Sequence, residues 1–77
     1  MITLLPMKAA TVATRLSRAS FYNRIREGLM PRPVKVGERL SAWPDHEIEA
    51  INAATIAGKS RDEIKALVAT LERQRAA

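Results

Sequence analysis

Hydrogen-bonding side chains are concentrated in one short segment, residues 17–27. Its guanidinium, hydroxyl and amide groups include those of Arg18, Ser20, Tyr22, Asn23 and Arg26. Guanidinium and amide groups donate hydrogen bonds to base edges and phosphate oxygens, and hydroxyl groups can both donate and accept. The chemistry that we expect of this segment is therefore recognition of a nucleic acid, not the making and breaking of covalent bonds.

A helix would present these groups together. Ser17 is a favoured N-cap residue, and Gly28 is a favoured C-terminal stop because glycine tolerates left-handed geometry. Phe21 and Ile25 lie four residues apart and would face the core, which leaves the polar side chains outside. A helix about 10–12 Å across fits the DNA major groove. We expect its first two turns to contact bases.

A small basic hairpin is expected to follow this helix. Pro31-Arg32-Pro33 favours an extended chain, because each proline fixes its own torsion angle and disfavours helix at the residue before it. Residues 34–36 and 40–43 then form two short strands around a three-residue loop that ends at Arg39. Lys35 points outward in this pattern. Such a hairpin can reach a neighbouring groove or the phosphates.

The hairpin must pack on the helices, because an isolated two-stranded ribbon is marginally stable. Strand alternation turns Val34 and Val36 to the core. We expect Trp43 to hold the hairpin against the helices. We assign its ring to the core and not to a surface on which a nucleic-acid base stacks.

Charge is divided unevenly along the 77 residues, whose formal net charge is +5. Residues 1–43 hold eight basic and two acidic residues, whereas residues 44–77 hold five basic and six acidic ones. The positive excess thus lies in the first half, which indicates a polyanionic partner for that half.

Two more helices are expected, one before and one after the segment of residues 17–43. Residues 7–14 form a weak helix after Pro6, which either ends the preceding apolar stretch or starts the helix. Another helix opens at Pro44-Asp45 and ends at Gly58. Its apolar stripe consists of Ile48, Ile51 and either Thr55 or Ile56.

The last predicted helix begins at the capping-box pattern of residues 60–63 and runs to about Arg73. Its apolar stripe consists of Ile64, Leu67, Val68 and Leu71. This stripe either packs back onto its own domain or forms a homodimer seam or a docking surface for another protein, such as an integrase.

Several segments resemble the AlpA family of prophage regulators, which is related to phage excisionases and MerR-type winged helices. They are residues 4–8, 16–28, 31–39 and 42–50, so the resemblance covers roughly residues 4–52. It implies a mainly α fold with a small β-hairpin: a winged helix-turn-helix over residues 1–57, followed by a C-terminal helix in 58–77 for packing or oligomerisation. Residues 17–27 would be the recognition helix and residues 35–39 the wing.

The sequence departs from the family pattern at two places. Arg15 stands where the family usually has a turn glycine, which either distorts the turn or adds a phosphate contact. Ala9 stands where an acidic residue is common, which removes a partner charge. The chain beyond about Ala57 lies outside the shared region.

The function that the resemblance and the residues imply together is sequence-specific binding of double-stranded DNA by a transcriptional regulator of a phage or integrated element. The alternatives are an excisionase-type factor that bends DNA for an integrase, or a protein-interaction module that uses residues 60–75. The candidate DNA-binding residues are Arg15, Ser17, Arg18, Ser20, Tyr22, Asn23, Arg24, Arg26, Arg32, Lys35 and Arg39.

Other classes of function are disfavoured. His46 has no second ligand or base at useful spacing, and the acidic residues beside it suit a helix dipole better than an active site. We therefore expect no enzyme activity, metal, cofactor or small-molecule substrate. The sequence has no cysteine and no long apolar run, which favours a cytoplasmic, nucleoid-associated protein without a membrane role.

Overall fold

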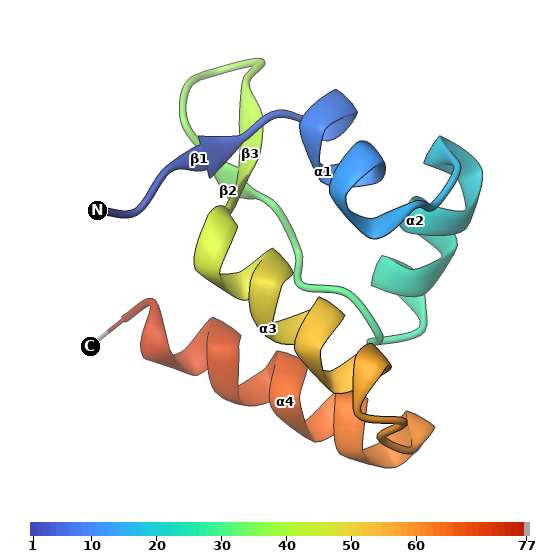
Figure 1. Cartoon of the computed structure of the whole chain (residues 1–77). Helices are drawn as coiled ribbons and strands as arrows, with labels where there is room; N and C mark the ends of the chain where they lie inside the picture. The colour runs from blue at the N-terminus through green and yellow to red at the C-terminus, as the bar shows by residue number, and fades with distance from the viewer. Residues whose placement is uncertain (77) are drawn as a thin grey trace.

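The computed structural model describes residues 1–76, and over that range it has four helices and a small three-stranded sheet (Figure 1). The elements in chain order are β1 (Leu4–Leu5), α1 (Met7–Thr14), α2 (Arg18–Arg26), β2 (Val34–Lys35), β3 (Ser41–Pro44), α3 (Asp45–Ile56) and α4 (Arg61–Gln74). The fold is mainly α with a small β-hairpin, as predicted, and has the winged helix-turn-helix arrangement.

The sheet has the order β1-β3-β2, and both pairs of neighbours are antiparallel. The expected hairpin is present, with Val34 opposite Ala42. Strand β1 was not predicted from the sequence, and its Leu4 lies opposite Pro44 on the other edge of β3. A two-residue strand has no alternation to detect, so only its partner defines it.

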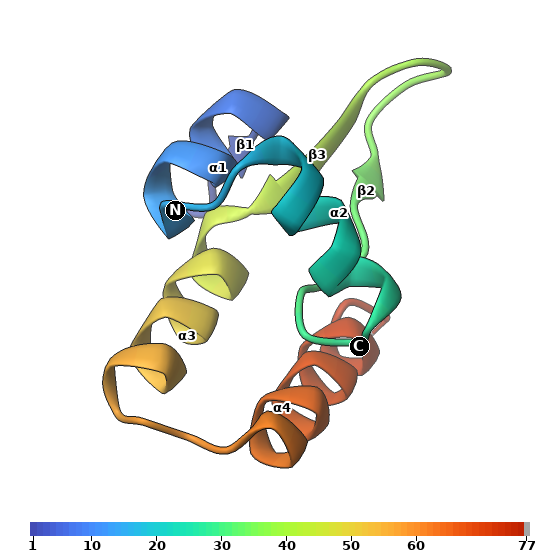
Figure 2. The same cartoon turned by 90° about the vertical axis from the view of Figure 1, so that its right-hand side faces the viewer.

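The two valines that were predicted to face the core differ in burial. Val34 is half-buried, but Val36 is 52% exposed, so its predicted inward orientation is wrong. Strand β2 ends at Lys35, and Val36 already belongs to the loop, where its N–H donates to the Leu40 carbonyl oxygen. The loop projects beyond the rest of the fold (Figure 2).

Trp43 joins the helical and β parts of the core. Its ring meets Phe21 of α2 edge to face, with the ring centroids 5.1 Å apart, and its Nε1–H donates to the Pro31 carbonyl oxygen at 2.9 Å. Both side chains are buried, which confirms Trp43 as a core residue and Phe21 as the inward face of α2. The core cluster consists of Ala10, Phe21, Met30, Trp43, Ile48, Ile51, Val68 and Leu71.

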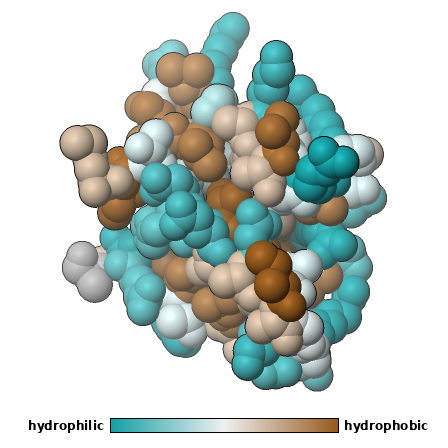
Figure 3. Space-filling view, viewed as in Figure 1, coloured by the Kyte–Doolittle hydropathy of each residue, from teal (hydrophilic) through white to brown (hydrophobic). Residues whose placement is uncertain are grey.

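Helix α4 contributes Val68 and Leu71 to this cluster, so its apolar face packs on its own chain. Ala54 occupies the next buried position of α3, and Ile56 is 87% exposed, so the expected use of Thr55 or Ile56 in that stripe is wrong. Figure 3 shows hydrophobic side chains in separate groups between hydrophilic ones.

Three helices end in the same left-handed turn. Gly28 and Gly58 follow α2 and α3 with φ of 78° and 72°, as their sequence positions predict. Arg15 follows α1 with φ of 62°, and the N–H groups of Arg15 and Leu16 donate to carbonyl oxygens of the last turn of α1. This is a Schellman arrangement in which arginine takes the place that glycine usually holds.

None of the helices formed by residues 1–76 has the length and apolar character that crossing a membrane requires.

Candidate nucleic-acid interface

The exposed face of α2 lies opposite its buried face. Phe21 is fully buried and Ile25 is half-buried, which turns the other side of the helix to solvent. The polar side chains exposed there are Arg18, Tyr22, Asn23 and Arg26. Four of the predicted groups therefore share one helical surface, with a guanidinium near each end.

The first turn of α2 is held by two serines. The Ser17 hydroxyl oxygen accepts from the Ser20 backbone N–H at 3.1 Å, which confirms the predicted N-cap, and the two hydroxyl groups are 3.0 Å apart. Both side chains are exposed. The cap keeps the first turn of the helix formed, where Arg18 lies.

Each of the two exposed arginines of α2 contacts another side chain of the same helix. The Arg18 guanidinium carbon lies 5.7 Å from the centre of the Tyr22 ring, a cation–π arrangement. The Arg26 Nη2 donates to the Asn23 side-chain oxygen at 2.8 Å. These contacts restrict the side chains to the helix surface before any ligand is bound.

Two other predicted residues lie away from this face. Arg24 is half-buried and lines a small cavity with Thr14 and Asn52, near α1 and α3. Arg15 is exposed in the turn before α2 and borders a shallow groove together with Ser17.

The hairpin offers a second group of cations. Lys35 and Arg39 are exposed, the first at the end of β2 and the second in the loop. The loop closes through hydrogen bonds from the Val36 and Gly37 N–H groups to the Leu40 carbonyl oxygen. The hairpin loop that carries Arg39 extends away from the rest of the fold (Figure 2).

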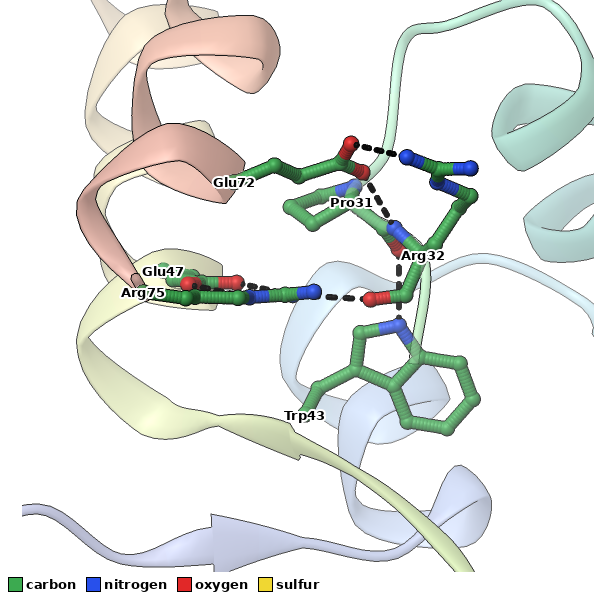
Figure 4. A network of polar contacts seen from close by, with 6 residues as sticks. All are labelled: Pro31, Arg32, Trp43, Glu47, Glu72 and Arg75. Atoms are coloured by element: carbon green, nitrogen blue, oxygen red, sulfur yellow. Dashed lines mark hydrogen bonds and ion pairs between the residues drawn. The ribbon is translucent and has the colours of Figure 1, made fainter. Parts of the chain in front are cut away.

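Arg32 is bound to the C-terminal helix (Figure 4). Its backbone N–H and its Nη2 donate to the two carboxylate oxygens of Glu72 at 2.8 and 3.1 Å. Burial raises the pKa of Glu72, but the hydrogen bonds and the charge of Arg32 outweigh it and hold that pKa below its ordinary value. The Arg32 side chain is nevertheless 75% exposed.

A second ion pair, which the sequence did not predict, lies beside this contact and has a buried carboxylate. Arg75 donates from Nε and Nη2 to the two carboxylate oxygens of Glu47, whose side chain is 1% exposed. The Arg75 Nη2 also donates to the Arg32 carbonyl oxygen at 2.7 Å (Figure 4). The hydrogen bonds to Glu47 raise the pKa of Arg75. The two contacts tie the segment before β2 to α3 and α4.

Chemically, the arrangement is suited to binding a polyanion. Two exposed arginines on α2 and two exposed cations on the hairpin are carried by separate elements, and the shared Phe21–Trp43 contact links those elements. Within residues 1–76 there is no group of three His, Cys, Asp or Glu side chains that could hold a metal ion.

The fold and these surfaces define a winged helix-turn-helix protein, and comparison with known families agrees. The family described as Prophage CP4-57 regulatory protein (AlpA) matches residues 3–51, from before β1 into α3. The chain belongs to this family of phage-related regulatory DNA-binding proteins, which confirms the resemblance. Searches of curated proteins and of solved structures found no match. Helix α4 lies outside the matched range.

Proposed function

We propose that the protein is a sequence-specific transcriptional regulator of a phage or integrated element, with α2 in the major groove and the β2–β3 loop on the adjacent groove or backbone. The observation that carries this proposal is the exposed face of α2. It exposes Arg18, Tyr22, Asn23 and Arg26 to solvent, while Phe21 of the same helix is buried. A nine-residue helix exposed on one side can enter the major groove without unfolding the core.

The candidate residues divide into two roles. Arg15, Arg24, Arg32, Lys35 and Arg39 neutralise phosphates, which sets affinity and its dependence on salt. The side chains in the groove discriminate bases: Arg18, Ser20, Tyr22, Asn23 and Arg26. Ser17 supports them by holding the first turn of α2.

Glu72 modifies the role of Arg32. This carboxylate already pairs with the Arg32 guanidinium. A phosphate must therefore displace the carboxylate or bind the guanidinium together with it. We therefore expect a smaller loss of affinity on removing Arg32 than on removing Lys35, for which the structure gives no ion pair among residues 1–76.

Selection of bound sequences from a pool of random duplexes tests the proposal, followed by mobility-shift assays at two salt concentrations. We expect a defined motif and an affinity that falls steeply with salt. Its symmetry reports whether one or two copies bind. Arg73→Ala is a matched control, because it removes an exposed cation from α4. Absence of binding in dilute buffer would overturn the proposal.

The excisionase-type alternative uses the same two elements and differs in its effect on DNA shape. A circular-permutation bending assay with the selected site separates the two, because an architectural factor bends its site strongly. The protein-interaction alternative would use the apolar face of residues 60–75, but Val68 and Leu71 of that face are buried in the core.

A further inference from the structure

Asn23 and Arg26 are joined by a side-chain hydrogen bond on the exposed face of α2. The donor is the Arg26 Nη2 and the acceptor is the Asn23 side-chain oxygen, 2.8 Å away. A guanidinium group has donors only, so the amide oxygen must be the atom that faces it. The contact therefore fixes which end of the amide remains free.

The pair presents hydrogen-bond donors to a ligand. The Asn23 amide oxygen faces the guanidinium, so the atoms left for contact are the amide N–H groups and the remaining N–H groups of Arg26. An asparagine that recognises adenine needs its oxygen and its nitrogen together, because adenine offers one donor and one acceptor in the major groove. The Arg26 contact already occupies one lone pair of that oxygen, so adenine would have to share the oxygen with the guanidinium.

Guanine is the base that matches a surface of donors. In the major groove it presents two acceptors, N7 and O6, and an arginine fork can donate to both. Cytosine presents a donor there, and thymine presents one acceptor beside a methyl group. We propose that Asn23 and Arg26 act as one unit that selects guanine over adenine, with Arg26 contacting the base and Asn23 positioning its guanidinium.

The charge and exposure of the pair support this role. Both side chains are exposed, so nothing in the core requires the hydrogen bond. In water such a contact is weak, but it strengthens when the groove excludes water from it. The Arg26 side chain then has fewer conformations to lose when it binds the base. The inference rests on the proposed function, because it assumes that α2 enters the major groove.

The test is sequence selection from random duplexes with the full chain and four variants. Arg26→Ala removes the base contact, and Asn23→Leu removes the acceptor that holds it. Asn23→Asp keeps an acceptor for the guanidinium while removing the amide donors. Arg18→Ala removes another exposed cation from the same helix and serves as the control. Thermal unfolding of each variant verifies that the fold is retained.

We expect one guanine in the selected motif to depend on Arg26. Arg26→Ala should reduce the preference for guanine over adenine there roughly 5- to 150-fold, which corresponds to about 1–3 kcal/mol at about 1.4 kcal/mol per tenfold. Asn23→Leu should lose part of this preference, and Asn23→Asp should retain more of it. Arg18→Ala should change affinity or another position and leave this guanine selected.

Three results would overturn the inference while leaving the proposed function in place. They are an adenine at the position that depends on Arg26, a motif that Arg26→Ala does not change, and an Asn23→Asp variant that loses guanine as fully as Asn23→Leu. A full chain that binds duplexes but selects no motif would overturn both, because the proposed function requires sequence-specific binding.

Discussion

Arg75 and Glu47 form a bidentate ion pair that joins the C-terminal end of the described chain to the first turn of α3. Arg75 Nη2 lies 2.5 Å from Glu47 Oε1, and Arg75 Nε lies 2.9 Å from Glu47 Oε2. The Glu47 side chain is almost fully buried, whereas the Arg75 side chain is 24% exposed. Because Arg75 also binds the Arg32 carbonyl oxygen, the pair helps to fix the chain that leads into the wing.

Arg75→Ala should lower the free energy of unfolding by about 3 kcal/mol, because it leaves a buried carboxylate without its cation. Urea denaturation measures the change. Arg73→Ala is the control, since Arg73 is exposed and its side chain donates to the Thr70 hydroxyl within α4. The double variant Glu47→Leu/Arg75→Leu should recover much of the loss, because neither charge remains buried. Equal stabilities for the two single variants would contradict this account.

Features coded within one helix could be predicted from the sequence. The Ser17 cap, the capping box between Ser60 and Glu63, and the left-handed glycines at 28 and 58 are all present. Each depends on residues within a few positions of one another, so local propensity decides it. The exposed side of α2 could be predicted for the same reason, because the spacing of Phe21 and Ile25 defines the buried side of the helix.

Features that join distant residues could not be predicted. The pairing of Leu4 with Pro44 and the ion pair of Glu47 with Arg75 depend on how the helices and strands pack. An acidic residue in the first turn of a helix looks the same whether it is a dipole partner in solvent or a buried ion. The half-burial of Arg24 depends likewise on the position of α1 and α3 beside α2.

Acid should weaken the contact between Glu72 and Arg32. The pKa of Glu72 in the folded protein is below its ordinary value of 4.5, so the contact stabilises the fold above that pH and is lost as the pH falls through the lower, folded-state pKa. Melting temperatures measured from neutral pH to about pH 2 should fall less for Glu72→Gln than for the unaltered protein. Arg32→Ala should be intermediate, because the backbone N–H of residue 32 still donates. Parallel pH curves for all three would contradict the assignment.

Removal of residues 59–77 should prevent folding, although the sequence placed a domain boundary near residue 57. The truncation removes Val68 and Leu71 from the core and leaves Glu47 without Arg75. Circular dichroism and amide dispersion in NMR spectra would report the loss. If α4 served oligomerisation instead, the shortened chain would fold and bind DNA as a monomer. That result would support an independent unit over residues 1–57.

The wing cations should affect all DNA sequences alike. Lys35→Ala and Arg39→Ala should each weaken binding to specific and random duplexes by similar factors, and each should reduce the salt slope by about 1. Glu38→Gln removes an anion from the same loop and should strengthen binding slightly. Mobility shifts over a salt series measure these effects. A changed base preference in either cation variant would show that the hairpin contacts bases.

Arg15→Gly should stabilise the fold and weaken DNA binding. The left-handed backbone at Arg15, with φ of 62°, matches the geometry that Gly28 and Gly58 supply elsewhere. Glycine removes a penalty of about 1–2 kcal/mol but adds chain entropy to the unfolded state, so the expected net gain is about 0.5–1 kcal/mol. If Arg15 contacts a phosphate, the same variant should lose affinity and reduce the salt slope by about 1.

Arg15→Asn separates the two effects, because asparagine tolerates the left-handed region and carries no charge. It should bind DNA as weakly as Arg15→Gly while gaining less stability. Thermal unfolding and mobility shifts on the same samples compare the variants directly. A destabilised Arg15→Gly variant would refute the strain argument. Unchanged affinity in both variants would mean that the arginine in this turn makes no contact with DNA.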